Sequence, residues 1–303
     1  MDSQRPPTQI KKAIPLVLLA ALFNTIMILF AKMASQTTPI VIILFARYLT
    51  TLIIILPFVY FNPVHQKVSQ FLKTDRPYLH LIRDILGLTS VFCYFYAART
   101  LSLADATVLF STAPLFIPII AFFWGNIKII HRLWWGMSLG FLGVLLMLHP
   151  GREIFQPAAL IGLFSGLCAA IVYVGSRYLS YSEPPLRNMF YYFAIGTFIA
   201  FLLILPGGKT IWQHFDLKVL WLLIGVGVFA YLYQWCFTES TRYAPVRLTT
   251  PLLYASVIFA LFLDWWLWQI KPSLLSLSSI ILIICGAVLL VWLYPEEDYQ
   301  LRR

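Results

Sequence analysis

Residues 102–116 of the chain read SLADATVLFSTAPLF, and residues 243–254 read YAPVRLTTPLLY. Both stretches reach a proline within an apolar run, and both follow a segment rich in aromatic residues. Each also precedes a segment in which glycine is followed by valine and leucines, GFLGVLLM at 140–147 and GAVLL at 286–290. This repeated order of features predicts that the chain is built as two similar halves.

The chain around these stretches is strongly apolar. Hydrophobic residues make up 60% of the 303 residues and charged residues only 11%, whereas roughly a quarter of a soluble domain is charged. A helix that spans a bilayer needs about 20 mainly apolar residues. Ten such windows occur, at 13–34, 39–61, 78–100, 104–124, 132–149, 157–179, 186–206, 218–239, 244–268 and 273–294. The expected fold class is an all-α membrane protein with ten transmembrane helices.

The ten helices divide into two repeats of five, predicted at residues 13–149 and 157–294. Because five is odd, the second repeat must run through the membrane inverted relative to the first. Inverted repeats are typical of transporters, whose binding site lies near the bilayer midplane between the halves. This architecture predicts a carrier that works by alternating access.

The net charge of +10 is explained by membrane orientation. Lys and Arg stand singly between apolar runs and not together on one polar face, so nucleic acid is not an expected partner. With the N-terminus inside, the inside segments hold about twice as many basic residues as the outside segments, as the positive-inside rule requires. We expect a multi-pass protein of the cell membrane, in bacteria the inner membrane, with both termini cytoplasmic.

The repeated stretches, together with GFLGVLLMLHPG at 140–151, resemble the EamA family of the drug/metabolite transporter superfamily over essentially the whole chain. The resemblance implies a ten-helix carrier whose central cavity is lined mainly by the first four helices of each half. The family often carries a Gly-Glu pair after the fourth and ninth helices, where this chain has Gly125-Asn126 and Trp268-Gln269.

Within the superfamily, residues 103–116 are most similar to a branch that contains S-adenosylmethionine uptake carriers and exporters of amino acids or metallophores. The resemblance therefore implies a small polar metabolite, such as an amino acid or an S-adenosylmethionine-like solute, as the small-molecule partner.

Arg47 is the first candidate for contact with this solute. It falls within the second predicted helix, roughly 12 Å from the nearer membrane surface at about 1.5 Å per residue. An ionisable side chain at depth is a functional candidate by default. A buried guanidinium suits a carboxylate or phosphate because it offers two parallel donors. The alternatives are an arginine that extends to the surface or one that ties two helices together.

Further solute-binding candidates are polar or aromatic residues within the predicted helices. Tyrosine and tryptophan suit stacking on a ring or a cation, and each polar group in lipid needs an internal partner. Helix packing is the alternative for each. The set is Asn24, Tyr94, Ser111, Thr112, Tyr173, Gln234, Trp235 and Tyr254.

Asp84 and Asp105 are candidates for proton coupling, although neither is predicted at the midplane. Pro114 and Pro251 are expected to break the fourth and ninth helices, because proline removes a backbone hydrogen bond. Such breaks occur at transporter sites and hinges, and also as simple kinks.

Other classes of function are disfavoured. The five histidines show no metal-ligand spacing, and no HExxH or GxSxG motif occurs, so we expect no enzyme, metal or cofactor. No filter-like loop repeats in the sequence, but a channel, sensor or structural protein is the remaining alternative. The spacing of Gly136 with Gly140, and of Gly162 with Gly166, predicts close helix packing within the chain, or between two copies in a homodimer.

Overall fold

The computed structural model describes residues 10–61, 71–125, 133–147, 156–180, 183–206, 216–243 and 250–293. Within these ranges the regular elements are all helices. Six helices are long and apolar enough to span a membrane, and four shorter apolar helical stretches accompany them. The predicted class, an all-α membrane protein of ten membrane helices, is confirmed, and the molecule is a multi-pass membrane protein.

The helices follow one another in the order that the apolar windows predict. The first half holds α1 (Ile10–Ala34), α2 (Ile40–Tyr60), α4 (Pro77–Thr100), α5 (Leu103–Phe110), α6 (Ala113–Gly125) and α7 (Leu133–Met147). The second half holds α8 (Pro157–Ser180), α9 (Pro185–Ile204), α10 (Leu217–Tyr243), η2 (Thr250–Tyr254), α12 (Ala255–Trp268) and α13 (Leu274–Leu293).

The fourth predicted span is not one continuous helix. It is divided into α5 and α6, which are separated by Ser111 and Thr112. Pro114 has no N–H to donate to the carbonyl of Phe110, so the helical hydrogen-bond ladder is interrupted there. The hydroxyl of Thr112 instead donates to the carbonyl of Leu109 at 2.6 Å. In the ninth span, Pro251 lies in the short 3₁₀ helix η2, directly before α12.

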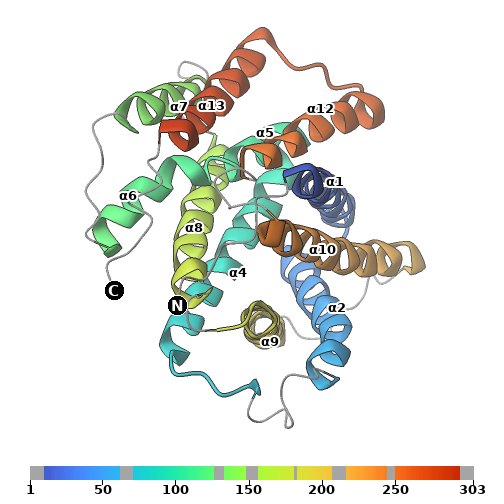
Figure 1. The fold of residues 1–303 in the computed structure, drawn as a ribbon. Coiled ribbons are helices and arrows are strands. Elements are labelled where there is room, and N and C mark those ends of the chain that lie inside the picture. Colours follow the sequence, from blue (N-terminus) through green and yellow to red (C-terminus); the bar gives the residue numbers. More distant parts are fainter. Residues whose placement is uncertain are drawn as a thin grey trace.

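Matching helices of the two halves make matching contacts (Figure 1). Helix α1 packs against α10 of the second half, and α8, which corresponds to α1, packs against α4 of the first. The last helices, α7 and α13, lie side by side, and α2 packs against α9. The two halves are therefore interleaved, so that the centre of the bundle lies between them.

The two ends of the bundle are defined by where the helices begin and finish. At the end where α1 begins, Lys12 lies 5.8 Å from the centre of the Tyr243 ring at the end of α10. Helix α4 begins at this same end, because it finishes where α1 finishes, with Lys32 donating to the carbonyl of Leu101. Helix α9 begins there too, since His80 of α4 and Glu183 are 2.8 Å apart. We call this the N-terminal end. The opposite end, where α1 and α4 finish and α5 begins, is called the distal end.

Glycines allow several helices of the bundle to come very close. A Cβ atom on Gly286 of α13 would lie 2.4 Å from the backbone nitrogen of Gly140 on α7. A Cβ on Gly166 of α8 would lie 2.4 Å from Oγ1 of Thr112. The glycine pairs Gly136/Gly140 and Gly162/Gly166 therefore lie in contacts between helices of one chain. A homodimer through them remains a prediction.

The surface of the bundle carries many large apolar side chains. Phe123 on α6, Trp135 on α7 and Trp292 on α13 are between 75% and 80% exposed. In water such a surface would be an aggregation hazard. In a bilayer it is the face presented to lipid, as the apolar composition predicts.

Helix α12 ends because Gln269 adopts a left-handed conformation with φ of 54°. A side chain with a Cβ costs about 1–2 kcal/mol in this region, and glycine avoids the cost. We expect Gln269→Gly to raise the free energy of unfolding by about 1 kcal/mol, measured by thermal unfolding in detergent. Gln269→Ala loses the same side-chain hydrogen bond, from Nε2 to the carbonyl of Trp266, but retains a Cβ. An equal gain in both variants would contradict this explanation.

Candidate functional site

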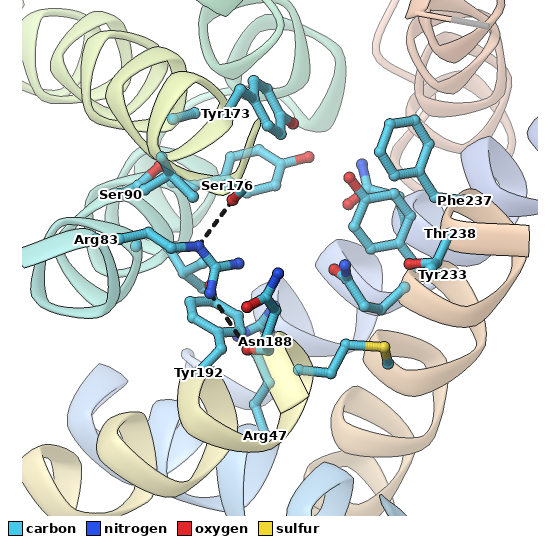
Figure 2. Close-up of a pocket in the computed structure, with 18 of the residues that line it drawn as sticks. Arg47, Arg83, Ser90, Tyr173, Ser176, Asn188, Tyr192, Tyr233, Phe237 and Thr238 are labelled. Carbon is cyan, nitrogen blue, oxygen red and sulfur yellow. Dashed lines mark hydrogen bonds between the residues drawn. The ribbon is translucent and has the colours of Figure 1, made fainter. Parts of the chain in front are cut away.

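A cavity of about 240 Å³ lies between the two halves, among α1, α2, α4 and α5 of the first and α8, α9 and α10 of the second. Its polar lining consists of Asn24, Arg47, Arg83, Ser90, Ser176, Asn188, Gln234 and Thr238. Its aromatic lining consists of Tyr94, Phe110, Tyr173, Tyr192, Tyr233 and Phe237. Figure 2 shows Arg83, Asn188, Tyr192 and Arg47 on one wall and Tyr233, Phe237 and Thr238 opposite.

The cavity reaches toward the N-terminal end of the bundle. Its lining includes Pro185, the first residue of α9, and Thr238 near the end of α10. Among the described residues, the lining contains no Asp, Glu or Lys. The charges directly at its surface are therefore the two guanidinium groups.

Arg47 projects from α2 and is only 4% exposed. Its guanidinium carbon lies 4.7 Å from the centre of the Tyr48 ring and 5.9 Å from that of Tyr192. Its Nε and Nη1 have no hydrogen-bond partner within the described part of the chain. None of the ion pairs found there includes Arg47. The cavity wall thus holds a buried cation whose two donors can serve a bound acceptor.

The rings beside Arg47 are held firmly in place. The hydroxyl of Tyr48 donates to that of Tyr192 at 3.0 Å, which joins α2 to α9. Helix α9 approaches closely because a Cβ on Gly196 would lie 2.4 Å from the Tyr48 ring. Thr51, one turn further along α2, donates to the carbonyl of Gly227 on α10 at 2.9 Å. Arg47 is therefore supported by helices of both halves.

Arg83 makes a second charged centre, on α4. Its Nε donates to Oγ of Ser176 at 2.7 Å, and its Nη1 donates to Oδ1 of Asp84 at 3.0 Å and to the carbonyl of Asn188 at 3.3 Å. Figure 2 shows the bonds to Ser176 and Asn188. Oδ2 of Asp84 and Oδ1 of Asn188 are buried and have no partner among the described residues. Unused acceptors thus accompany the unused donors of Arg47.

A polar cluster secures the wall behind Arg83. Oε2 of Glu183 lies 2.8 Å from Nε2 of His80 and 3.9 Å from Nη1 of Arg187. Thr74 donates to the other carboxylate oxygen. The cluster fixes the starts of α4 and α9 against each other at the N-terminal end.

Five of the predicted solute-binding residues line the cavity: Asn24, Arg47, Tyr94, Tyr173 and Gln234. Tyr94 is held by stacking on Phe110, with ring centres 4.4 Å apart. The predicted grouping of polar and aromatic residues from both halves is thus present around one space.

Ser111, Thr112 and Tyr254 lie outside the cavity lining, and their contact with a solute stays a prediction. The hydroxyl of Tyr254 donates at 2.8 Å to the carbonyl of Ser111. The hydroxyl of Thr112 is also bonded to backbone. These residues satisfy backbone groups where the helix break near Pro114 meets η2, which contains Pro251.

Trp235 is 47% exposed and also lies outside the lining, so its contact with a solute stays a prediction. It follows Gln234, which faces the cavity, and successive residues of an α-helix point about 100° apart. Trp235 therefore faces the surrounding lipid.

The two predicted carboxylates lie in different places. Asp84 is fully buried behind the cavity wall, paired with Arg83. Asp105 lies in the first turn of α5, at the distal end. Among the described residues, no cluster of three His, Cys, Asp or Glu could hold a metal ion.

Arg83, Asn188 and Tyr192 were not predicted as site residues. Arg83 could have been found by the rule that ionisable residues at depth are functional candidates. Asn188 falls only two residues inside the predicted seventh helix, and nothing in the sequence distinguishes it from an interfacial residue.

Comparison with known proteins identifies one family. The model of the EamA-like transporter family matches residues 11–149 and again residues 156–292. Two successive matches account for nearly the whole chain, one for each half. The family consists of transporters and not of enzymes.

Several relatives are similar over most of their length. The pseudopaline exporter CntI of Pseudomonas aeruginosa is 26% identical over 93% of this chain and 96% of its own. An S-adenosylmethionine uptake transporter of Rickettsia felis is 26% identical over 86% and 84%. A riboflavin transporter of Vibrio cholerae is 25% identical over 81% of each chain. A solved crystal structure shares the fold with a TM-score of 0.62 at 17% identity, over 92% of this chain and 96% of that one.

Proposed function

Because this chain belongs to the EamA-like transporter family, we propose that it carries a small polar metabolite by alternating access, with the central cavity as the solute site. Rocking of the two halves would expose a site between them to each side in turn. The position of the cavity between the halves supports this proposal.

The observation that carries the proposal is the buried guanidinium of Arg47, which has no acidic partner among the described ion pairs and whose Nε and Nη1 lack a hydrogen-bond partner there. A buried charge without a partner is costly, so it favours a bound group of opposite charge. A carboxylate matches the fork of a guanidinium with two parallel hydrogen bonds. The solute is therefore expected to carry a carboxylate, which binds to the guanidinium of Arg47.

The remaining lining supports a zwitterionic solute with a planar or cationic part. Oδ1 of Asn188 lacks a donor among the described residues, so an ammonium or amide group of the solute would satisfy it. Tyr94, Tyr173 and Tyr233 offer ring faces for stacking or for cation–π contact. An amino acid or an S-adenosylmethionine-like solute combines these features, which agrees with the substrate named for the Rickettsia relatives.

For coupling to protons, Asp84 is the stronger of the two candidates. Its carboxylate is bonded to Arg83, which lines the cavity, and one of its oxygens lacks a partner in the described ranges. Protonation of Asp84 would weaken its hold on Arg83 and so alter the charge at the cavity. Asp105 lies at the distal end, in the first turn of α5.

We place the N-terminal end of the bundle in the cytoplasm, as the charge distribution predicts. In a bacterium this would be the cytoplasmic side of the inner membrane. The cavity, which reaches toward Pro185 at this end, would then face the cytoplasm in this conformation.

Counterflow in proteoliposomes tests the proposal. Vesicles are loaded with methionine, S-adenosylmethionine or riboflavin, and uptake of the same labelled compound is followed. A carrier of the proposed class gives transient, saturable accumulation with one of the first two. Absence of counterflow with both methionine and S-adenosylmethionine, whether or not riboflavin is carried, would contradict the proposed substrate class.

A further inference from the structure

At the distal end of the bundle, a buried carboxylate joins the two halves. Asp264 of α12, in the second half, accepts hydrogen bonds from the backbone N–H groups of Leu103 at 2.9 Å and Ala104 at 2.7 Å. Both donors belong to the first turn of α5, in the first half. Asp264 is only 2% exposed, and each of its carboxylate oxygens receives one of the bonds.

Helix α5 does not depend on Asp264 for its ordinary cap. Ser102 occupies the N-cap position, and its Oγ accepts from the N–H of Asp105 at 3.0 Å. The first N–H groups of a helix have no partner within the helix, and Asp264 satisfies two of those that Ser102 leaves. A residue of the second half thus completes the start of a helix in the first.

Lys32 strengthens the same contact. Its Nζ donates to the carbonyl of Leu101 at 2.5 Å and lies 5.1 Å from the centre of the Trp268 ring on α12. Lys32 and Asp264 are both buried at this contact, with 8% and 2% exposure. The ends of α1, α4 and α12 and the start of α5 therefore meet around Lys32 and Asp264.

We propose that Asp264 is a latch that holds the distal end of the cavity closed and must release α5 before the site can open there. This proposal rests on the alternating access proposed above. The cavity reaches the N-terminal end, whereas the bonds of Asp264 lie at the other. Opening the distal end separates α12 from α5 and removes both bonds. Asp264 is therefore a positioning residue that sets the balance between the two conformations.

Thiol labelling in a variant without Cys93, Cys168, Cys236 and Cys285 tests the latch. Met27, which lines the cavity from α1 and is 2% exposed, is replaced by cysteine as the reporter. A membrane-impermeant maleimide is applied from the distal side of oriented vesicles. We expect Asp264→Asn to raise the labelling rate about tenfold, a shift of about 1.4 kcal/mol between conformations.

Asp216→Asn is the matched control. Asp216 also accepts a bond from a helix-starting N–H, that of Leu217 at 2.6 Å, but within its own half. The control should label at the rate of the parent. An equal rise of the labelling rate in both variants would indicate general loosening and overturn the latch. An unchanged labelling rate in Asp264→Asn protein would also overturn it, provided that this variant unfolds at the same temperature as the parent.

If Asp264→Asn does not fold, Lys32→Met replaces it in the same assay. This change removes the cation–π contact with Trp268, which is the part of the Lys32 contact that crosses between the halves, and the same direction of change is expected. An unchanged labelling rate in folded Lys32→Met protein would then overturn the latch. Labelling requires no solute, so a failed latch with normal counterflow leaves the proposed function intact. Absence of counterflow with normal latch behaviour contradicts only the proposed substrate.

Discussion

Replacing Arg47 with alanine is expected to reduce counterflow of a carboxylate solute by about 100-fold or more. A hydrogen bond to a charged group contributes about 1.5–3 kcal/mol, and the guanidinium offers two free donors in Nε and Nη1. Each 1.4 kcal/mol changes the affinity tenfold. The loss should appear at solute concentrations that are subsaturating for the wild type, measured by initial rates in proteoliposomes.

Arg47→Lys separates charge from geometry. An ammonium group preserves the positive charge but not the planar fork, so we expect an intermediate loss of about tenfold. A second test uses the solute with its carboxylate converted to a primary amide. Replacing Arg47 should reduce counterflow of this amide less than counterflow of the carboxylate, because the amide lacks the charge that Arg47 would neutralise.

Arg99→Ala is the control for the loss of one arginine. Arg99 lies in the last turn of α4 and is exposed, so its removal should leave counterflow unchanged. Normal counterflow by both Arg47→Ala and Arg47→Lys, at wild-type protein levels, would show that Arg47 does not contact the solute.

The number of helices could be predicted because each lipid-spanning segment must satisfy its own backbone and expose apolar side chains. The depth of Arg47 in the bundle followed from its place in the second apolar run, where a single charge is costly unless it faces the protein interior. These inferences require only local sequence, and this is why they could be made without knowing how the helices pack.

The direction in which each helix faces could not be predicted as well. Helix α10 is apolar over most of its surface, so no amphipathic pattern distinguishes Gln234, which faces the cavity, from Trp235, which faces lipid. The surroundings of Ser111 and Tyr254 could not be predicted for a related reason. Their bond to each other depends on how the breaks in two distant helices meet.

The hydrogen-bond partners of Arg83 could not be predicted, because they come from segments that are distant in the sequence. Its bonds to Ser176 and Asn188 cross between the halves, over more than 90 residues of sequence. The latch at Asp264 likewise joins positions 160 and 161 residues apart. The sequence supplies the charges, but only the packing of α4 on α8 and of α12 on α5 shows which groups they meet.

Helices α7 and α13 pack backbone against backbone at Gly286. A Cβ on Gly286 would lie 2.4 Å from the nitrogen and 2.6 Å from Cα of Gly140, and 2.7 Å from the carbonyl oxygen of Gly136. All three are backbone atoms, so no side-chain rotation can relieve the overlap. Gly286→Ala must therefore push the two helices apart along their contact.

We expect Gly286→Ala to lower the free energy of unfolding by about 1–3 kcal/mol or more, as overpacking does in well-packed cores. The measurement is thermal unfolding of the purified protein in detergent. Gly140→Ala, in the same interface, is the matched control. Its Cβ would meet Cδ2 of Leu115 at 2.4 Å, and this side-chain end can turn aside.

The comparison of the two alanine variants decides whether backbone proximity is what holds α7 against α13. If it is, Gly286→Ala unfolds at a clearly lower temperature than Gly140→Ala, although each adds a single methyl group. Equal losses would mean that the interface yields by moving side chains. Because lipid competes for apolar surface, close backbone packing is a main source of helix association in membranes, and Gly286 is where this chain relies on it most directly.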